Sequence, residues 1–237
     1  QYYRTMIKAK DIDRVIAGHS AIMDAYDPQR KVGLVCDEWG TWWQVEPGTH
    51  PRFLYQQNTL RDALVASLHF DIFHKYAARL RMANIAQTLN VLQAMILTDD
   101  TETLVLTPTY HVFEMNKGHQ DAISVPVHLI AQPDEIELGE DRLSTVTASG
   151  SINDNTFLLS ISNLSADSDL SVELDLRGRA VRSPRARILT ADKPQEHNTS
   201  AAPAAVSPRE FDVTLDGARL RAELPRHSFA TVELDLE

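Results

Sequence analysis

The spacing of apolar residues predicts a helix, a strand and a second helix in the first part of the chain. From Tyr2 to Tyr26 most apolar residues lie three or four positions apart, as in an amphipathic helix, and Asp27-Pro28 follows as a stop. Residues 32–36 form an uninterrupted apolar run, which is typical of a strand buried on both faces. The helical period returns over residues 56–76.

Residues 80–97 form a further apolar stretch, which predicts a second strand, but amide side chains interrupt it. These amides belong to Asn84, Gln87, Asn90 and Gln93. Burying them costs free energy unless each finds a hydrogen-bond partner. One more short helix is expected within residues 110–120, so residues 1–120 follow the order helix, strand, helix, strand, helix. That order is typical of the βα units of a parallel sheet.

Beyond residue 120 the apolar pattern changes to a period of two in short blocks. The blocks are residues 125–130, 144–148, 157–162, 170–176, 186–189, 211–215, 220–224 and 229–236. This pattern is typical of antiparallel strands with one buried face, and about eight of them in one segment predict a β-sandwich. We therefore expect an α/β part over residues 1–120 and an all-β part over residues 121–237.

Composition and charge narrow the class of partner. The 237 residues are 43% hydrophobic and 24% charged, which is a globular composition able to bury a core. With 33 acidic against 23 basic residues the net charge is -10, and no cluster of Lys and Arg stands out, so we expect no nucleic-acid partner. No apolar run approaches the ~20 residues that cross a bilayer, so we expect no membrane span.

The single cysteine bears on the compartment. Cys36 has no partner for an internal disulfide, which favours a reducing, cytoplasmic environment. The chain begins with Gln1 rather than methionine, so we expect that whatever preceded Gln1 has been removed, any signal peptide with it, and a secreted protein stays open.

Residues 32–40 join the first predicted strand to a candidate catalytic group. The apolar run ends on Asp37, Glu38 and Trp39. In a parallel α/β barrel the catalytic groups lie where the strands end, so Glu38 is a candidate for chemistry. The alternative is that Asp37 and Glu38 only open a solvated loop.

Other kinds of site find little support. The histidines include no His-Glu-x-x-His pair, and His69 and His74 are five residues apart, off one helical face, so no metal is expected. No glycine-rich phosphate loop occurs, so no nucleotide cofactor is expected. Cys36 lies in an apolar strand, where burial raises the pKa of a thiol, and is expected to be an inert core residue.

The residues around Glu38 suit a sugar. Trp39, Trp42, Trp43 and Tyr55 are nearby in sequence, and the amide-rich strand follows. Aromatic faces bind the C–H patches of a sugar and amides bind its hydroxyls, so this combination predicts a carbohydrate site. Packing of the loop is the alternative reading for Trp39 and Trp43.

Several motifs resemble family 51 of the glycoside hydrolases, the α-L-arabinofuranosidases. They are Asp37-Glu38-Trp39-Gly40-Thr41-Trp42, Gln56-Gln57-Asn58-Thr59-Leu60-Arg61-Asp62-Ala63-Leu64, Met82-Ala83-Asn84-Ile85-Ala86-Gln87-Thr88, Thr107-Pro108-Thr109-Tyr110-His111-Val112-Phe113, and Leu189-Thr190-Ala191-Asp192 with His197-Asn198-Thr199. The resemblance implies the C-terminal part of a (β/α)8 barrel followed by a jelly-roll β-sandwich. It also implies that Glu38 is the nucleophile at the end of the seventh strand, that Gln87 hydrogen-bonds the sugar or the nucleophile, and that Trp42 lines the arabinose pocket.

A retaining glycosidase needs a second carboxyl group, about 5 to 5.5 Å from the first, as acid and base. In the family that group is a glutamate in an Asn-Glu pair at the end of the fourth strand, and no such match occurs here. Glu46, in a predicted turn, and Glu114, on a predicted helix, do not fit the motif. We therefore expect this chain to lack the acid/base residue and to be the C-terminal portion of a longer enzyme, inactive alone.

The leading hypothesis is an exo-acting, retaining α-L-arabinofuranosidase that removes terminal arabinofuranosyl residues from arabinan, arabinoxylan or their oligosaccharides. The resemblance implies no cofactor, a homo-oligomer and an intracellular location. Two alternatives stay open: a noncatalytic carbohydrate-binding or assembly module, and a related glycosidase with a different sugar specificity.

Overall fold

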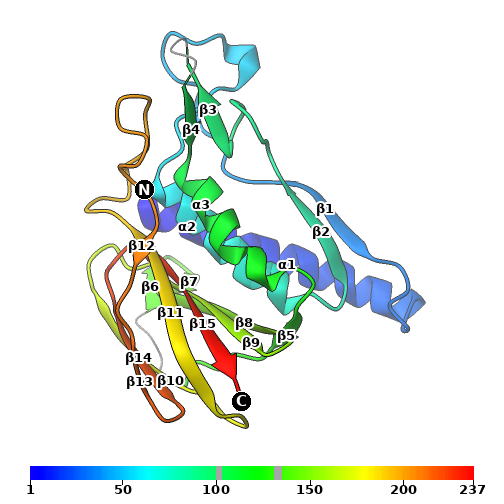
Figure 1. The fold of residues 1–237 in the computed structure, drawn as a ribbon. Helices are drawn as coiled ribbons and strands as arrows, with labels where there is room; N and C mark the ends of the chain where they lie inside the picture. Colours follow the sequence, from blue (N-terminus) through cyan, green and yellow to red (C-terminus); the bar gives the residue numbers. More distant parts are fainter. Residues whose placement is uncertain (100–102, 131–134) are drawn as a thin grey trace.

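Helices cover one face of a sheet in the computed structural model, which describes residues 1–99, 103–130 and 135–237 (Figure 1). The helices are α1 (Tyr2–Tyr26), α2 (Leu60–Lys75) and α3 (Pro108–Asn116), with short 3-10 turns η1 (Pro51–Phe53) and η2 (Lys117–His119). The strands of the first half are β1 (Leu34–Trp39), β2 (Leu80–Ile85), β3 (Ile96–Thr98) and β4 (Leu104–Leu106). The predicted order of helices and strands up to residue 120 is therefore confirmed, with β3 and β4 as an additional hairpin.

The second half is made of antiparallel strands in two main sheets. The strands are β5 (Ile123–Val125), β6 (Glu135–Leu138), β7 (Asp141–Ser144), β8 (Val146–Asn153), β9 (Thr156–Asn163), β10 (Leu170–Asp175), β11 (Val181–Thr190), β12 (Arg209–Glu210), β13 (Thr214–Asp216), β14 (Arg219–Leu224) and β15 (Ser228–Leu236). The larger sheet has the order β12-β11-β15-β9-β8-β5, and the smaller has the order β10-β14-β13. The predicted all-β half is confirmed, except that residues 126–130 form no strand and the predicted block at 211–215 is mostly loop.

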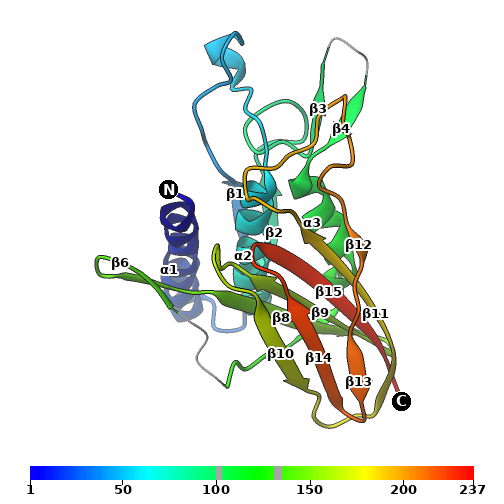
Figure 2. The same ribbon diagram turned by 90° about the vertical axis from the view of Figure 1, so that its left-hand side faces the viewer.

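The larger sheet is buried on both faces. The smaller sheet lies along one face of the larger one (Figure 2). That face is apolar, and alternate residues of β15, among them Ala230, Val232 and Leu234, pack there with Leu220 and Leu224 of β14. The opposite face lies against α2 and α3, and on β8 and β9 it carries mainly serines, with Leu158 as an aliphatic side chain among them. Those serines find hydrogen-bond partners on the helical elements, since Ser162 donates to Ser67 of α2 and Ser160 donates to Asn116 of α3. Helices and sheet are thus joined by polar contacts as well as apolar ones.

One core joins the two halves of the chain. The cluster that contains Leu64 of α2 and Val112 of α3 also contains Leu164, Leu189 and Phe229 from the β-rich half. Each of these side chains is essentially inaccessible to solvent. A boundary at residue 120 therefore separates two kinds of secondary structure that share a hydrophobic core.

β1 and β2 form a parallel pair that stands beside the helices, and no closed barrel surrounds them in the described residues. The prediction that the first strand is buried on both faces is wrong for this structure, because its burial alternates and Val35 is 43% exposed. Met82 on β2 is 55% exposed in the same way. The reason is that Val35 and Met82 are register partners on the same face of the pair, and no other element of the described residues covers that face, whereas Leu34 and Cys36 on the opposite face pack against the helical core.

A buried arginine fixes the N-terminal ends of β1 and β2 to α1. Arg79, which precedes β2, is 2% exposed and forms ion pairs with Asp24 and Asp27 at the end of α1. Its guanidinium also donates to the carbonyl oxygen of Val32 at 2.8 Å, just before β1. The start of both strands is therefore anchored at the C-terminus of α1. No helix in the described part of the chain is long and apolar enough to cross a membrane.

Candidate active site

Glu38 lies at the carboxyl end of β1, on the edge of the pair where β2 also ends. The two strands run parallel, with Trp39 opposite Ile85, and the backbone amide of Ala86 donates to the carbonyl oxygen of Trp39 at 2.9 Å. The Glu38 side chain is exposed. The sequence thus predicted the position of this carboxylate at a strand end correctly.

Glu38 and Trp42 line a pocket of about 240 Å³ together with Ala86 and Leu92. The same two side chains also border a larger cavity of about 890 Å³, which extends to residues such as Tyr3 and Lys8 at the start of α1. Trp42 is 66% exposed, so most of its indole face is open to a ligand. A carboxylate beside an open aromatic face is the arrangement expected of a sugar site.

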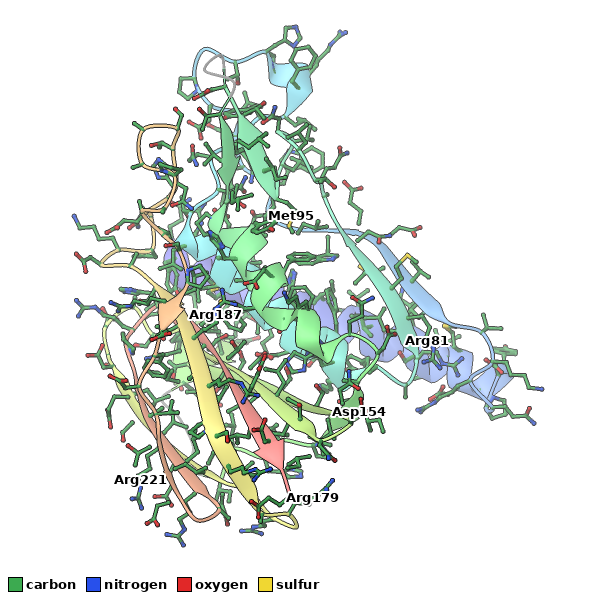
Figure 3. All side chains as sticks on the ribbon, viewed as in Figure 1. Arg81, Met95, Asp154, Arg179, Arg187 and Arg221 are labelled. Atoms are coloured by element: carbon green, nitrogen blue, oxygen red, sulfur yellow. The ribbon has the colours of Figure 1, made fainter. Side chains whose placement is uncertain are left out.

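Gln87 follows Ala86 directly, so its backbone lies at the rim of the smaller pocket. The backbone is held by hydrogen bonds from its own amide to the carbonyl oxygen of Val91 (3.0 Å) and from the amide of Met95 to its carbonyl oxygen (3.3 Å). Figure 3 shows Met95 beside this loop. The Gln87 side chain is exposed and, in the described part of the chain, makes no hydrogen bond to Glu38 or to another protein group. The structure thus places Gln87 just after the carboxyl end of β2, as the family resemblance implied, but without a hydrogen bond to Glu38 in the described residues.

The tryptophans near Glu38 divide into core and surface. Trp39 is 5% exposed and packs against aromatic residues of α2 and α3, with its ring stacked on Phe113 at 5.8 Å. The packing interpretation is therefore correct for Trp39. Trp43 is half-buried, with its ring 4.0 Å from the Arg61 guanidinium. Trp42 is the tryptophan of this segment that is open to a ligand.

The four amides of residues 80–97 also have different environments. Gln93 is fully buried and Asn90 half-buried, and both have partners, whereas Asn84 is exposed. The Asn90 side chain donates to the Thr98 hydroxyl (2.6 Å) and accepts from the Thr98 amide (2.8 Å), so it holds the turn before β3. A structural role thus accounts for Asn90.

A buried polar network fixes the loop that follows Glu38. Gln93 is 0% exposed, accepts a hydrogen bond from the Thr41 amide (2.8 Å) and donates to the carbonyl oxygen of Asp62 (2.7 Å). Gln56, 1% exposed, accepts from the Trp43 amide at 2.8 Å. Gly40 is required at the start of this loop, because its φ is +139° and an added Cβ would lie 3.2 Å from the Cβ of Gln93. The sequence did not predict this network. The one indication in the sequence was that the Gln93 amide, within an apolar stretch, would need hydrogen-bond partners.

Residues of the β-rich half reach the same region. The first two amides of α2, on Leu60 and Arg61, have no acceptor within the helix and donate instead to the carbonyl oxygens of Glu196 (2.9 Å) and Pro194 (2.8 Å). Asn198, 1% exposed, donates to the carbonyl oxygens of Leu106 (2.8 Å) and Val206 (2.9 Å). The segment 194–198 therefore connects the β-rich half to the start of α2 and to β4.

Glu46 and Glu114 bond to residues outside the Glu38 pockets. The Glu46 carboxylate accepts from the Gln57 amide at 3.0 Å. Glu114 forms an ion pair with Arg187 at 2.9 Å, and Figure 3 shows Arg187 on β11 at the end nearer α3. Hydrogen bonding to Arg187 holds the pKa of the Glu114 carboxyl below its usual value, which is unsuited to a catalytic acid. Neither residue lies among those that line the Glu38 pockets.

The histidines and the cysteine have structural environments. Burial lowers the pKa of His69 and of His74 to about 4, and both rings bond to neighbouring groups. No group of three or more potential metal ligands occurs in the described residues. Cys36 is half-buried, and burial raises the pKa of its thiol, which makes it less reactive.

Comparison with known proteins decides the family. The model of the α-L-arabinofuranosidase C-terminal domain matches residues 37–228. The chain belongs to the α-L-arabinofuranosidase family. It is 45% identical over 236 residues to an intracellular exo-α-L-arabinofuranosidase of Bacteroides ovatus, an alignment that covers 98% of this chain and 45% of that protein. The family resemblance read from the motifs is thereby confirmed.

Two further relatives agree. The solved family 51 arabinofuranosidase of Xanthomonas axonopodis pv. citri superposes with a TM-score of 0.94 at 45% identity, covering 99% of this chain and 47% of that one. An intracellular exo-α-(1→5)-L-arabinofuranosidase of Bifidobacterium longum is 26% identical over 96% of this chain and 46% of its own length. The predicted fold class is thus confirmed as the C-terminal portion of the family 51 fold. The chain spans about half the length of these relatives.

Proposed function

We propose that this chain supplies the nucleophile of a retaining exo-α-L-arabinofuranosidase that removes terminal α-L-arabinofuranosyl residues from arabinan, arabinoxylan or their oligosaccharides. The observation that carries the proposal is the position of Glu38 beside the open face of Trp42, at the carboxyl end of a parallel strand. The proposal that the catalytic unit is longer than this chain rests on the open edge of β1 and on the length of the relatives.

In the proposed mechanism the Glu38 carboxylate attacks the anomeric carbon and displaces the leaving oxygen. A carboxylic acid from outside this chain protonates that oxygen as the C–O bond breaks. The glycosyl ester on Glu38 is then hydrolysed by water, from which the second carboxylate, now a base, takes a proton. Each step forms one bond to the anomeric carbon and breaks another, so the configuration is inverted twice and retained overall.

Trp42 and Gln87 are proposed to bind the sugar. The exposed indole of Trp42 offers an apolar face for the ring, and the Gln87 amide, with both its donor and acceptor free of protein partners in the described residues, suits a sugar hydroxyl. We infer no cofactor, because acid, base and nucleophile are all carboxyl groups in this mechanism.

The test is Glu38→Gln in the full-length enzyme. We expect turnover of an aryl arabinofuranoside to fall by roughly six orders of magnitude, as after removal of the serine nucleophile of a protease. Arabinose binding, measured by calorimetry, is expected to change little, since the amide keeps the size of the side chain. Glu223→Gln is the matched control, because Glu223 is exposed on β14, far along the chain from the pocket residues. Normal turnover by Glu38→Gln would overturn the nucleophile assignment.

The sandwich offers little support for the alternative of a carbohydrate-binding module. Residues 121–237 contain three aromatic residues, all phenylalanines: Phe157, Phe211 and Phe229. Phe157 and Phe229 are buried, and Phe211 packs against the apolar cluster between the sheets. A sugar-stacking platform needs exposed aromatic faces, which this half does not have.

Three broader features of the enzyme are also proposed. We infer an intracellular location, because the relatives from Bacteroides ovatus and Bifidobacterium longum are intracellular arabinofuranosidases. We further propose a homo-oligomer and a division into a barrel portion over residues 1–120 and a jelly-roll over residues 121–237. Light scattering on the purified full-length enzyme tests the homo-oligomer, and a monomeric mass would contradict it. Limited proteolysis tests the division near residue 120.

A further inference from the structure

The side chain of Asp62 lies at the centre of the contacts that hold the loop after Glu38. Asp62 is in the first turn of α2 and is 0% exposed. One carboxylate oxygen, Oδ1, accepts from the Thr41 hydroxyl (2.8 Å) and from the indole N–H of Trp43 (2.8 Å). The other oxygen, Oδ2, accepts from the amide (2.9 Å) and the hydroxyl (3.0 Å) of Thr59. One buried side chain thus joins the loop of residues 40–43 to the start of α2.

We propose that Asp62 is a positioning residue for catalysis, whose carboxylate fixes residues 40–43 and thereby sets the placement of Glu38 and Trp42. This inference rests on the proposed function. Glu38 and Trp42 lie on either side of the anchored residues, one before Gly40 and one between Thr41 and Trp43. Because Oδ1 holds both Thr41 and Trp43, Trp42 is fixed at both of its neighbours.

The chemistry of the partners requires a carboxylate. The indole N–H of Trp43 and the amide of Thr59 donate only, and they face different oxygens of Asp62. The Arg61 guanidinium, also a donor, lies 3.2 Å from Oδ2 and 3.3 Å from Oδ1. An asparagine would place its NH₂ group against one of these donors in either orientation. Asp62 is therefore required because both of its carboxylate oxygens accept hydrogen bonds, and an asparagine of the same shape cannot replace it.

The same residue also stabilises the helix, and the two roles separate in the structure. Oδ1 faces the loop, whereas Oδ2 faces Thr59, which caps α2. Thr41 and Thr59 are matched, since each is 9% exposed and each donates its hydroxyl to Asp62. Removing the Thr41 hydroxyl takes away one of the two bonds from the loop to Asp62, and removing the Thr59 hydroxyl weakens the cap.

The experiment compares Thr41→Ala with Thr59→Ala in the full-length enzyme, with Thr41→Ser as the conservative variant. Thr41→Ala is expected to lower kcat on an aryl arabinofuranoside roughly tenfold to a hundredfold, because small displacements of reacting groups have effects of that size. Thr59→Ala is expected to keep kcat within about twofold while both alanine variants lower the unfolding temperature to a similar extent. Thr41→Ser is expected to restore kcat.

Asp62→Asn provides a second comparison. We expect it to lower kcat at least as much as Thr41→Ala does. Equal kcat for the folded Thr41→Ala and Thr59→Ala variants, or no recovery in Thr41→Ser, would overturn the positioning role while the wild-type enzyme stays active. A wild-type enzyme with no arabinofuranosidase activity would overturn the proposed function, and this inference with it.

Discussion

Acidification from about pH 7 to about pH 5 is expected to destabilise the protein through three buried histidines, one packed between α1 and α2 and two beside the large sheet. Burial lowers the pKa of His69 and His74 to about 4 and that of His119 to about 3, from an ordinary value of 6.5. His74 and His119 lie with ring centroids 4.5 Å apart and bond to serines of β8 and β9. All three are therefore neutral in the folded state over a range in which the unfolded chain protonates them.

One neighbouring carboxyl acts in the opposite direction. Burial raises the pKa of Asp71 on α2 to about 7, so the folded state holds a proton there that the unfolded chain releases down to about pH 4. Between about pH 5.5 and 4.5 the unfolded chain thus binds nearly three more protons on histidines and about one fewer on Asp71. The net difference of about two protons makes stability fall by roughly 2.7 kcal/mol per pH unit in that range as the pH drops. From pH 6.5 to 5 the loss is about 3 kcal/mol, because the unfolded histidines are only half protonated at pH 6.5, and this is a large part of the ~5–15 kcal/mol of a typical domain.

Urea unfolding followed by circular dichroism at a series of pH values measures this slope. His119→Gln keeps groups that bond to Ser151 and Ser160 but cannot take up a proton, so we expect its slope to be smaller by roughly 1.4 kcal/mol per pH unit. His128→Gln, at an exposed position, is the control and is expected to leave the slope unchanged. A stability that is flat between pH 6.5 and 5, or the same slope in His119→Gln and the wild type, would refute the reasoning.

Two more predictions concern the loops of the site. Trp42→Ala should raise KM roughly tenfold, as expected for a lost stacking face, and change stability by less than about 0.5 kcal/mol because the side chain is 66% exposed; an unchanged KM would remove Trp42 from the pocket wall. Asn198→Ala should cost about 2–4 kcal/mol in urea unfolding, because the carbonyl oxygens of Leu106 and Val206 and the amide of Val206 lose a buried partner; a cost below about 0.5 kcal/mol would show that water replaces the amide.

Local patterns predicted those elements that local interactions determine. α1 begins at Tyr2 and ends at Tyr26 as expected, since the helical period and Asp27-Pro28 act within the segment itself. The position of Glu38 at a strand end was predictable for the same reason. The short hairpin of β3 and β4 was not, because strands of three residues are too brief to show a period.

Burial on a particular face depends on partners that are distant in sequence. β9 alternates between aliphatic side chains and serines, a pattern that predicts one solvated face, yet nearly all of it is buried because α2 and α3 cover the serines. The role of Asp62 illustrates the same limit. Its spacing from Thr59 indicates a helix cap, but nothing near it in the sequence indicates Thr41 or Trp43 as partners.

The two hydrogen bonds from the start of α2 to Pro194 and Glu196 have a consequence for synthesis of the protein. During translation the segment 194–196 leaves the ribosome on the order of ten seconds after residues 60–61, at typical elongation rates. Until then the first amides of α2 lack their native acceptors, so the loop beside Glu38 stays incompletely held. The pocket beside Glu38 is therefore expected to be among the last parts of the nascent chain to mature, and a ribosome stalled shortly before residue 194 would expose a polypeptide in which the first amides of α2 still lack these acceptors.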